Sequence, residues 1–262
     1  MKLKRIHLFE FEDLSWFPNA MRASLTRLLS VMHKLLDTKK DIAQLIYQVS
    51  NHSDTTSIID LCSGSGGPMP AVAALLKEQH NVKNLTLTLT DIYPDKNLAG
   101  KVSSNGVRYL TEPVDATKVP KNLKGIRTMI CSFHHMKPDI ARNILVNAKE
   151  NKQPICIFEI SDNSFPIFLW WIALPLNFLT SFIITLFARP LTWQQILFTY
   201  LIPVIPLAFA WDGAVSNART YTLKDLDVLL EGLSSDDYRW EKGTIKGKSK
   251  KLYVLGLPAH TK

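Results

Sequence analysis

Residues 58–68 read IIDLCSGSGGP, and this stretch decides the fold expected of the chain. An apolar run carries one aspartate, Asp60, and then breaks into small residues, a pattern that predicts a buried strand entering a glycine turn. Such turns usually hold a nucleotide. The stretch lacks the lysine of a Walker loop, and CSGSGG departs from the G-x-G-x-x-G spacing of a dinucleotide fingerprint. A different nucleotide cofactor is therefore expected in this turn.

Strand and helix patterns alternate on the C-terminal side of the turn. Helical patterns at 70–79 and 139–150 separate short apolar runs that predict strands. This order implies right-handed crossovers and a mostly parallel sheet. A helix over 222–233 then precedes two strands joined by GKSK, which predicts a terminal antiparallel hairpin. The expected strands cover residues 57–61, 84–90, 106–110, 125–131, 153–160, 238–245 and 251–257.

The flanks of this pattern complete the predicted architecture. An apolar stripe at helical spacing from Trp16 to Met32 predicts a helix, and a second helix follows from Ile42. The predicted fold is α/β: a Rossmann-like, mostly parallel seven-stranded sheet with an antiparallel terminal hairpin, N-terminal helices and a hydrophobic helical insert after the fifth strand. We expect four parts: an N-terminal helical cap (1–56), a Rossmann-like cofactor-binding part (57–162), a membrane-associated insert (163–211) and a C-terminal part that completes the catalytic sheet (212–262).

The glycine turn resembles motif I of the class I S-adenosylmethionine-dependent methyltransferases, written D-x-G-x-G-x-G. Asp60, Gly64 and Gly66 match the motif, and Cys62 stands at its first glycine position. The resemblance implies that these residues bind S-adenosylmethionine. A Cβ at Cys62 narrows the approach that glycine leaves open to a cofactor. We therefore expect either a negative φ at Cys62 or a slightly displaced cofactor.

The resemblance extends to the acids that follow the next two strands. It covers residues 57–160 and 222–258, including the helix and hairpin that close the sheet. It implies that Asp91 binds the ribose hydroxyls, because a carboxylate accepts two hydroxyl donors at once. It also implies that Asp115 lies near the adenine. For each acid, a turn or helix-capping role is the alternative.

Two adjacent histidines, His134 and His135, follow the fourth strand in a loop that faces the substrate in an α/β sheet. A hydroxyl or amine that attacks a sulfonium methyl must lose a proton, and histidine titrates near neutral pH. One of the pair is therefore the candidate general base. Metal chelation with help from Asp162 and a purely structural role are the alternatives, and we expect no metal.

Two uncharged runs, at residues 165–188 and 191–211, follow the fifth strand. Each is long enough to cross roughly 30 Å of hydrocarbon as a helix. Three arrangements stay open: a kinked pair in the membrane interface with aromatic anchors, a spanning hairpin with Arg189-Pro190 at its tip, and a hydrophobic lid of a soluble enzyme. Each of them puts apolar surface beside the active-site face, which favours a lipophilic methyl acceptor.

The polar stretch WDGAVSNARTY at 211–221 follows the insert. On a helix, Asp212, Ser216 and Arg219 fall on one face. With Tyr221, these residues are candidates for contact with the substrate or with the methionine carboxylate. A surface ion pair is the alternative.

Charge and cysteine content narrow the expected setting. The 262 residues carry a formal net charge of +8, which beside long apolar runs favours an anionic lipid surface over nucleic acid. A solvated basic surface is the alternative. Cys62, Cys131 and Cys156 show no CxxC spacing, so a disulfide scaffold or zinc site is not indicated and a reducing compartment fits. The N-terminal stretch has no continuous apolar core, so no secretory signal peptide is expected.

We therefore expect an S-adenosylmethionine-dependent methyltransferase that methylates a lipophilic small molecule or lipid, at oxygen. It is expected at a membrane surface, with its catalytic domain on the cytoplasmic side. The signatures of nucleic-acid methyltransferases, Asn/Asp-Pro-Pro-aromatic and Pro-Cys, are absent after the fourth strand, so no nucleic-acid partner is expected. A nucleotide-dependent oxidoreductase with a Rossmann-like fold and a non-catalytic membrane scaffold of methyltransferase fold are the alternatives.

Overall fold

The computed structural model describes residues 3–53, 55–80, 82, 84–96, 98–103 and 106–259. The chain divides into two compact units, which are described separately. The sheet unit comprises Met1–Leu3, Thr38–Ile160 and Leu223–Lys262, and the helical unit comprises Lys4–Asp37 and Ser161–Thr222. This grouping cuts across the four predicted parts, because the helix at 38–50 packs with the sheet and residues 212–222 continue a helix of the insert.

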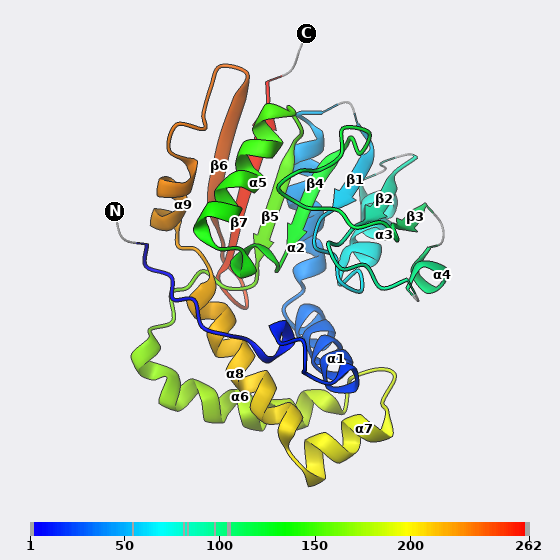
Figure 1. Cartoon of the computed structure of the whole chain (residues 1–262), viewed down its shortest axis with the longest axis vertical. Coiled ribbons are helices and arrows are strands. Elements are labelled where there is room, and N and C mark those ends of the chain that lie inside the picture. The colour runs from blue at the N-terminus through cyan, green and yellow to red at the C-terminus, as the bar shows by residue number, and fades with distance from the viewer. Residues whose placement is uncertain are drawn as a thin grey trace. The chain divides into compact units, whose positions relative to one another are not determined.

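A seven-stranded sheet, in the order β3-β2-β1-β4-β5-β7-β6, forms the centre of the sheet unit (Figure 1). The first five strands pair in parallel, and β7 runs antiparallel to both of its neighbours. The chain builds outward from β1 to β3, then returns to the other side of β1 with β4. This reversal creates a switch point, where ligands of open α/β sheets bind. The strands are β1 (Ser57–Asp60), β2 (Thr86–Leu89), β3 (Val107–Tyr109), β4 (Ile126–Ile130), β5 (Ile155–Glu159), β6 (Tyr238–Ile245) and β7 (Lys251–Pro258).

Helices cover the sheet and bury its apolar side chains. In α2, Ile42, Ile46 and Val49 recur at helical spacing and are almost fully buried in one core with residues of β1, β2 and β5. Two other helices start at prolines, which lack the N–H that a helix start leaves unpaired anyway. The helices and the short turn of this unit are α2 (Thr38–Ser50), α3 (Met69–Gln79), α4 (Ala99–Val102), η2 (Phe133–His135), α5 (Pro138–Glu150) and α9 (Leu223–Leu230).

The predicted α/β fold is confirmed, including the seven strands, their order along the chain and the antiparallel terminal hairpin. The central strands β4 and β5 are buried almost throughout because both faces of the sheet are covered there, and most of their residues are apolar. Strand ends differ from the predicted ones by up to two residues. The one-turn helix α4 was not predicted, since four residues carry too little periodicity to show a helix.

The helical unit is built around three longer helices, of which α6 and α8 pack against each other (Figure 1). Its core joins Leu25 and Leu28 of α1 to Ile184 of α6 and Ile205 of α8. The elements are η1 (Phe11–Asp13), α1 (Asn19–Leu35), η3 (Ile167–Leu169), α6 (Trp170–Thr185), α7 (Trp193–Ile196), the π turn η4 (Leu197–Leu201) and α8 (Val204–Arg219).

An N-terminal strap, residues 5–13, lies along α8 within the helical unit. The Ile6 amide donates to the Ala218 carbonyl at 2.8 Å. Further along, the Trp211 indole Nε1 donates to the Phe9 carbonyl at 2.9 Å. The strap is thus fixed to the middle and to the C-terminal end of α8, by residues about two hundred positions later in the chain.

The insert has the length and composition of membrane segments. Ile167–Thr185, 19 residues with a mean hydropathy of 1.9, could cross a membrane, and 11% of its most apolar window is buried. Trp193–Leu201 and Val204–Arg219 pass the same test together, but they are bent by 82° at the break between them. These properties are compatible with each of the three arrangements left open for the insert, which all stay predictions.

Candidate functional site

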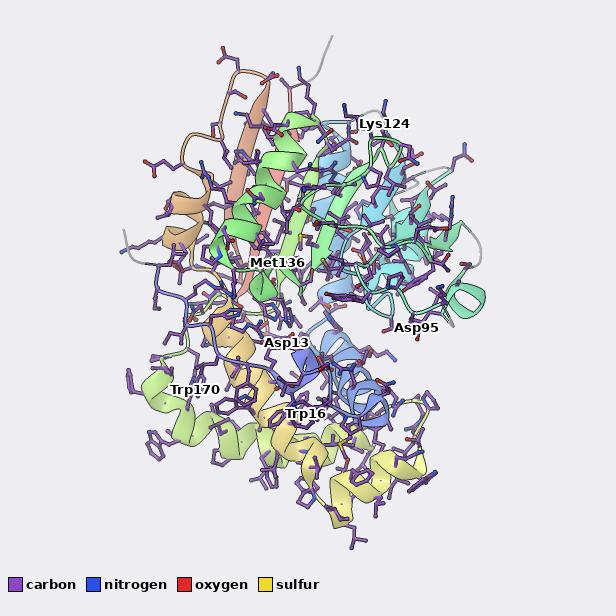
Figure 2. The ribbon with its side chains drawn as sticks, in the orientation of Figure 1. Asp13, Trp16, Asp95, Lys124, Met136 and Trp170 are labelled. Carbon is purple, nitrogen blue, oxygen red and sulfur yellow. The ribbon has the colours of Figure 1, made fainter. Side chains whose placement is uncertain are left out.

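The predicted site residues of the sheet unit lie at one edge of the sheet. Because β1 to β5 are parallel, their carboxyl ends meet at this edge. Met136, after β4, and Asp95, after β2, mark it in Figure 2, and Lys124, just before β4, marks the opposite edge. The predicted residues at the carboxyl edge are Asp60, Cys62, Gly64, Gly66, Asp91, Asp115, His134 and His135.

The glycine turn after β1 is tied to the end of β2. The Ser63 amide donates to the Thr90 carbonyl at 2.9 Å. Gly64 and Gly66 have φ of 52° and 95°, the left-handed region that favours glycine. A Cβ on Gly66 would lie 3.0 Å from Leu89 Cδ1, whereas one on Gly64 would meet open space. Packing therefore demands a glycine at 66, and Gly64 leaves the backbone open to a ligand.

Cys62 occupies the first glycine position with a φ of 57°, so the first of the two expected alternatives, a negative φ, is wrong, and a slightly displaced cofactor stays a prediction. A residue with a Cβ is strained in this conformation by roughly 1–2 kcal/mol. Burial, together with the charges of Asp91, Asp60 and Asp115, raises the pKa of its thiol to about 12. The thiol stays protonated at neutral pH, and the three predicted acids are gathered around it.

Replacing Cys62 by glycine should raise the free energy of unfolding by up to about 1 kcal/mol. Relief of the left-handed strain exceeds the roughly 0.5–1 kcal/mol of added chain entropy. Urea unfolding measures the change. Ser65→Gly in the same turn is the matched control, since Ser65 is not among the residues with positive φ and its replacement should only destabilise. Equal losses in both variants would contradict the strain at Cys62.

Asp60 ends β1 as a buried carboxyl. The Thr128 hydroxyl donates to its Oδ1 at 2.5 Å, and the Thr90 hydroxyl and amide both donate to its carbonyl at 2.9 Å. Burial raises the pKa of Asp60 to about 7, against the hydrogen bonds from Thr128 and Ser63, which lower it. The Asp60 carboxyl is thus a structural support under the turn as well as a candidate cofactor ligand.

Asp60 should make folding stability fall as the pH rises. Its pKa is about 7 in the folded protein and ordinarily 3.8, so the folded state binds more protons between these limits and stability decreases from pH 4 to pH 7. Asp60→Asn keeps an acceptor for Thr128 and should remove this share, on the order of 3 kcal/mol. Urea unfolding of both proteins at pH 5 and pH 8 measures it. A difference between the two proteins that is the same at both pH values would refute the raised pKa.

Asp91 and Asp115 close the site on the β2 and β3 side. Asp91 Oδ2 accepts from the Gly64 amide, and its Oδ1 accepts from the Tyr93 amide, both at 2.9 Å. Asp115 Oδ1 accepts from the amide and hydroxyl of Thr117, at 2.8 and 2.7 Å. Both carboxylates order their own loops, and each oxygen keeps lone pairs for further donors. Their cofactor roles stay predictions.

A buried carboxylate, which was not predicted from the sequence, contacts both the backbone and the side chain of His134. Glu159, the last residue of β5, accepts from the His134 backbone amide through Oε1 at 3.0 Å, and its Oε2 lies 2.8 Å from His134 Nδ1. Both side chains are buried. A carboxylate there fixes the tautomer with the proton on Nδ1, which makes Nε2 the basic nitrogen. One charged residue inside the apolar run ICIFEI was the signal in the sequence.

His135 and Ser132 complete the loop after β4. The His135 ring lies 4.2 Å from the His134 ring, centroid to centroid. Ser132 is buried, and its hydroxyl is without a hydrogen-bond partner among the described residues. Buried hydroxyls in proteins are almost always satisfied, so this one is a candidate ligand contact.

Two of the predicted substrate residues of the helical unit, Asp212 and Arg219, hold the strap, and their contact with a substrate stays a prediction. Asp212 Oδ1 accepts from the Phe11 amide at 2.7 Å, and Arg219 Nη1 lies 2.6 Å from Asp13 Oδ2 and 2.9 Å from Glu10 Oε1. These contacts account for the burial of both side chains without a substrate.

Tyr221 and Ser216 belong to the same region of the helical unit. The Arg5 guanidinium lies 4.3 Å from the centre of the buried Tyr221 ring and donates to its hydroxyl at 3.1 Å. Ser216, on α8, is half-buried, and its carbonyl accepts from the Thr220 hydroxyl at 2.8 Å. Contact of these two residues with a substrate stays a prediction.

No protein-family model matches this chain, and no curated protein matches it in sequence. Solved structures do resemble it. The plantazolicin methyltransferase BpumL in complex with SAH aligns over 95% of this chain and 94% of its own, with a TM-score of 0.55 and 12% identity. Its complex with a monoazolic desmethylPZN analog and SAH covers 92% and 90%, with a TM-score of 0.54 and 11% identity. The chain therefore has the fold of the class I S-adenosylmethionine-dependent methyltransferases, as its glycine turn predicts.

Proposed function

We propose that the protein is an S-adenosylmethionine-dependent methyltransferase that methylates a lipophilic small molecule or lipid at oxygen, at a membrane surface. We also propose that the sheet unit, which carries the catalytic residues, lies on the cytoplasmic side. The observation that carries the proposal is the buried His134–Glu159 pair at the carboxyl edge of the sheet, beside a glycine turn ringed by acids.

The carboxyl edge fits S-adenosylmethionine by the chemistry of its groups. The ribose hydroxyls and the ammonium group of this cofactor are donors, and the carboxylates of Asp60, Asp91 and Asp115 are acceptors. At Gly64 and Gly67, no atom of the described residues, apart from the chain neighbours, lies within 4 Å of the place that a Cβ would take, so the backbone is open there. SAH is present in both complexes of the similar fold. When bound, S-adenosylmethionine supplies an electrophilic methyl group.

His134 has the arrangement of a general base. Glu159 orients the imidazole and stabilises the imidazolium that forms when Nε2 takes a proton. An acceptor hydroxyl needs such a base, because it must lose its proton as the new bond forms. This requirement supports oxygen as the methyl acceptor and His134, rather than His135, as the base.

The helical unit supports a lipophilic acceptor and a membrane surface. Large apolar side chains are exposed along the insert, among them Phe168 and Trp171, each 72% exposed. Monomeric soluble proteins rarely leave such a surface uncovered. The net charge of +8 adds attraction to anionic lipid.

The test is incubation of the purified protein with methyl-labelled S-adenosylmethionine and a membrane extract. Label in the organic phase is expected, and the ¹³C shift of the transferred methyl group would place it on oxygen, nitrogen or carbon. Label only in protein or RNA would overturn the lipophilic acceptor. Co-sedimentation with anionic vesicles, against neutral vesicles as the control, tests the membrane surface separately.

A further inference from the structure

A cavity of about 540 Å³ lies wholly within the helical unit. Its volume falls in the range of small-molecule sites, roughly 300–1,000 Å³. It is formed by the strap, by one stripe of α6 and by one stripe of α8. The residues that line it are Phe9, Phe11, Leu174, Pro175, Phe178, Leu207, Ala210 and Trp211.

Polar groups in the walls of this cavity already form hydrogen bonds within the helical unit, so they are not directed at a ligand. The Phe9 carbonyl already accepts from Trp211 Nε1, and the Phe11 amide donates to Asp212. The Phe9 ring lies 5.3 Å from the Trp211 ring and 5.5 Å from the Phe11 ring. The strap therefore places two aromatic side chains in fixed positions and offers these polar backbone groups to its own anchors rather than to a ligand.

The chemistry of the lining selects the occupant. All eight lining side chains are apolar or aromatic, and the Trp211 N–H, the one polar side-chain group among them, is engaged. A peptide segment would bring an amide at every residue and leave it buried without a hydrogen-bond partner, which is unfavourable. A hydrocarbon chain brings no polar atom.

Part of the cavity lining is exposed, and α6, which forms one wall, also carries an exposed apolar face. Phe9 and Leu207, which line the cavity, are 50% and 60% exposed. On α6, Leu176, Leu179 and Ile183 are 60–62% exposed and share one face. The helix that forms this wall has the composition of a membrane segment, which favours an occupant drawn from an apolar phase.

We infer that this cavity binds the hydrocarbon tail of an amphipathic lipid. The inference rests on the proposed function in one respect: that the tail belongs to the methyl acceptor. The strap, held by Asp212 and Arg219, then acts as the wall that gives the acceptor its chain specificity.

Equilibrium dialysis of the full chain with radiolabelled laurate, below its micellar concentration, tests the site. Wild type should bind laurate saturably at one site and bind butyrate at least tenfold more weakly. Leu207→Trp fills the mouth and should weaken laurate binding at least tenfold. Leu179→Trp is the matched control, because Leu179 is 61% exposed on the neighbouring face and does not line the cavity; its affinity should stay within twofold.

Circular dichroism and calorimetry with S-adenosylmethionine check that each variant is folded. Phe178→Leu enlarges the cavity and should shift the preference toward longer chains, which keeps the inference testable if Leu207→Trp does not fold. Equal losses in Leu207→Trp and Leu179→Trp would show partition onto the exposed face and overturn the site, as would unsaturable binding. Because laurate binding needs no methyl transfer, the site can fail while the methyltransferase proposal survives, and the reverse.

Discussion

Replacing His134 by glutamine should lower the rate of methyl transfer by about 10²–10⁴-fold, the usual contribution of a general base. Glutamine keeps the size and polarity of the side chain but cannot take the proton. The affinity for S-adenosylmethionine, measured by calorimetry, should stay unchanged, because the substitution leaves Gly64 and Asp91 in place. Single-turnover rates with saturating acceptor measure the chemical step.

Three further variants isolate the role of His134. Glu159→Gln should lower the rate less than His134→Gln and shift its pH profile, since the imidazole loses its oriented counter-charge. His135→Gln should have a small effect. His80→Gln is the matched control, because His80 lies in the sheet unit at the end of α3 and stacks on Tyr47. Full rates in both His134→Gln and His135→Gln would remove the base assignment.

The second large effect is expected at Asp91. Asp91→Ala should weaken the binding of S-adenosylmethionine about 100-fold, since hydrogen bonds to a charged group contribute roughly 1.5–3 kcal/mol each. The loss has two sources: the acceptors for the ribose hydroxyls, and the bond that holds the Gly64 amide. Isothermal titration calorimetry gives the dissociation constant.

Asp91→Asn separates these two sources. Asparagine still accepts from the Gly64 amide but has lost the charge, so an intermediate affinity is expected. Glu112→Ala, an exposed acid in the connection between β3 and β4, is the control and should bind as wild type does. Unchanged affinity in Asp91→Ala would exclude Asp91 from the cofactor site.

Much of the sheet unit could be read from the sequence because its signals are local. Alternating or continuous apolar runs such as NLTLTLT reveal buried strands, and parallel pairing then brings strand ends to one edge. That rule, together with the motif, predicts the position of three acids at this edge: Asp60, Asp91 and Asp115. The left-handed backbone of Cys62 does not follow, since side-chain identity argues against it.

The remaining parts depend on contacts between distant positions. Glu159 ends β5 and His134 lies in η2, 25 residues earlier in the chain, so no local pattern pairs them. The same holds for Asp212 and Phe11, whose hydrogen bond links positions 201 residues apart. A helical face at 212–219 was visible in the sequence, but the segment that covers it was not.

The strap has a consequence for the order in which the chain can fold. It is synthesised before its partners on α8, which emerge some two hundred residues later. The phenylalanines of the strap therefore stay uncovered while the first five strands and α6 are synthesised. The sheet is delayed as well, because β7, the last strand, lies between β5 and β6. Neither unit can complete its packing until α8 and β7 have been synthesised. We therefore expect slow folding and a long exposure of apolar surface to chaperones or to a nearby bilayer.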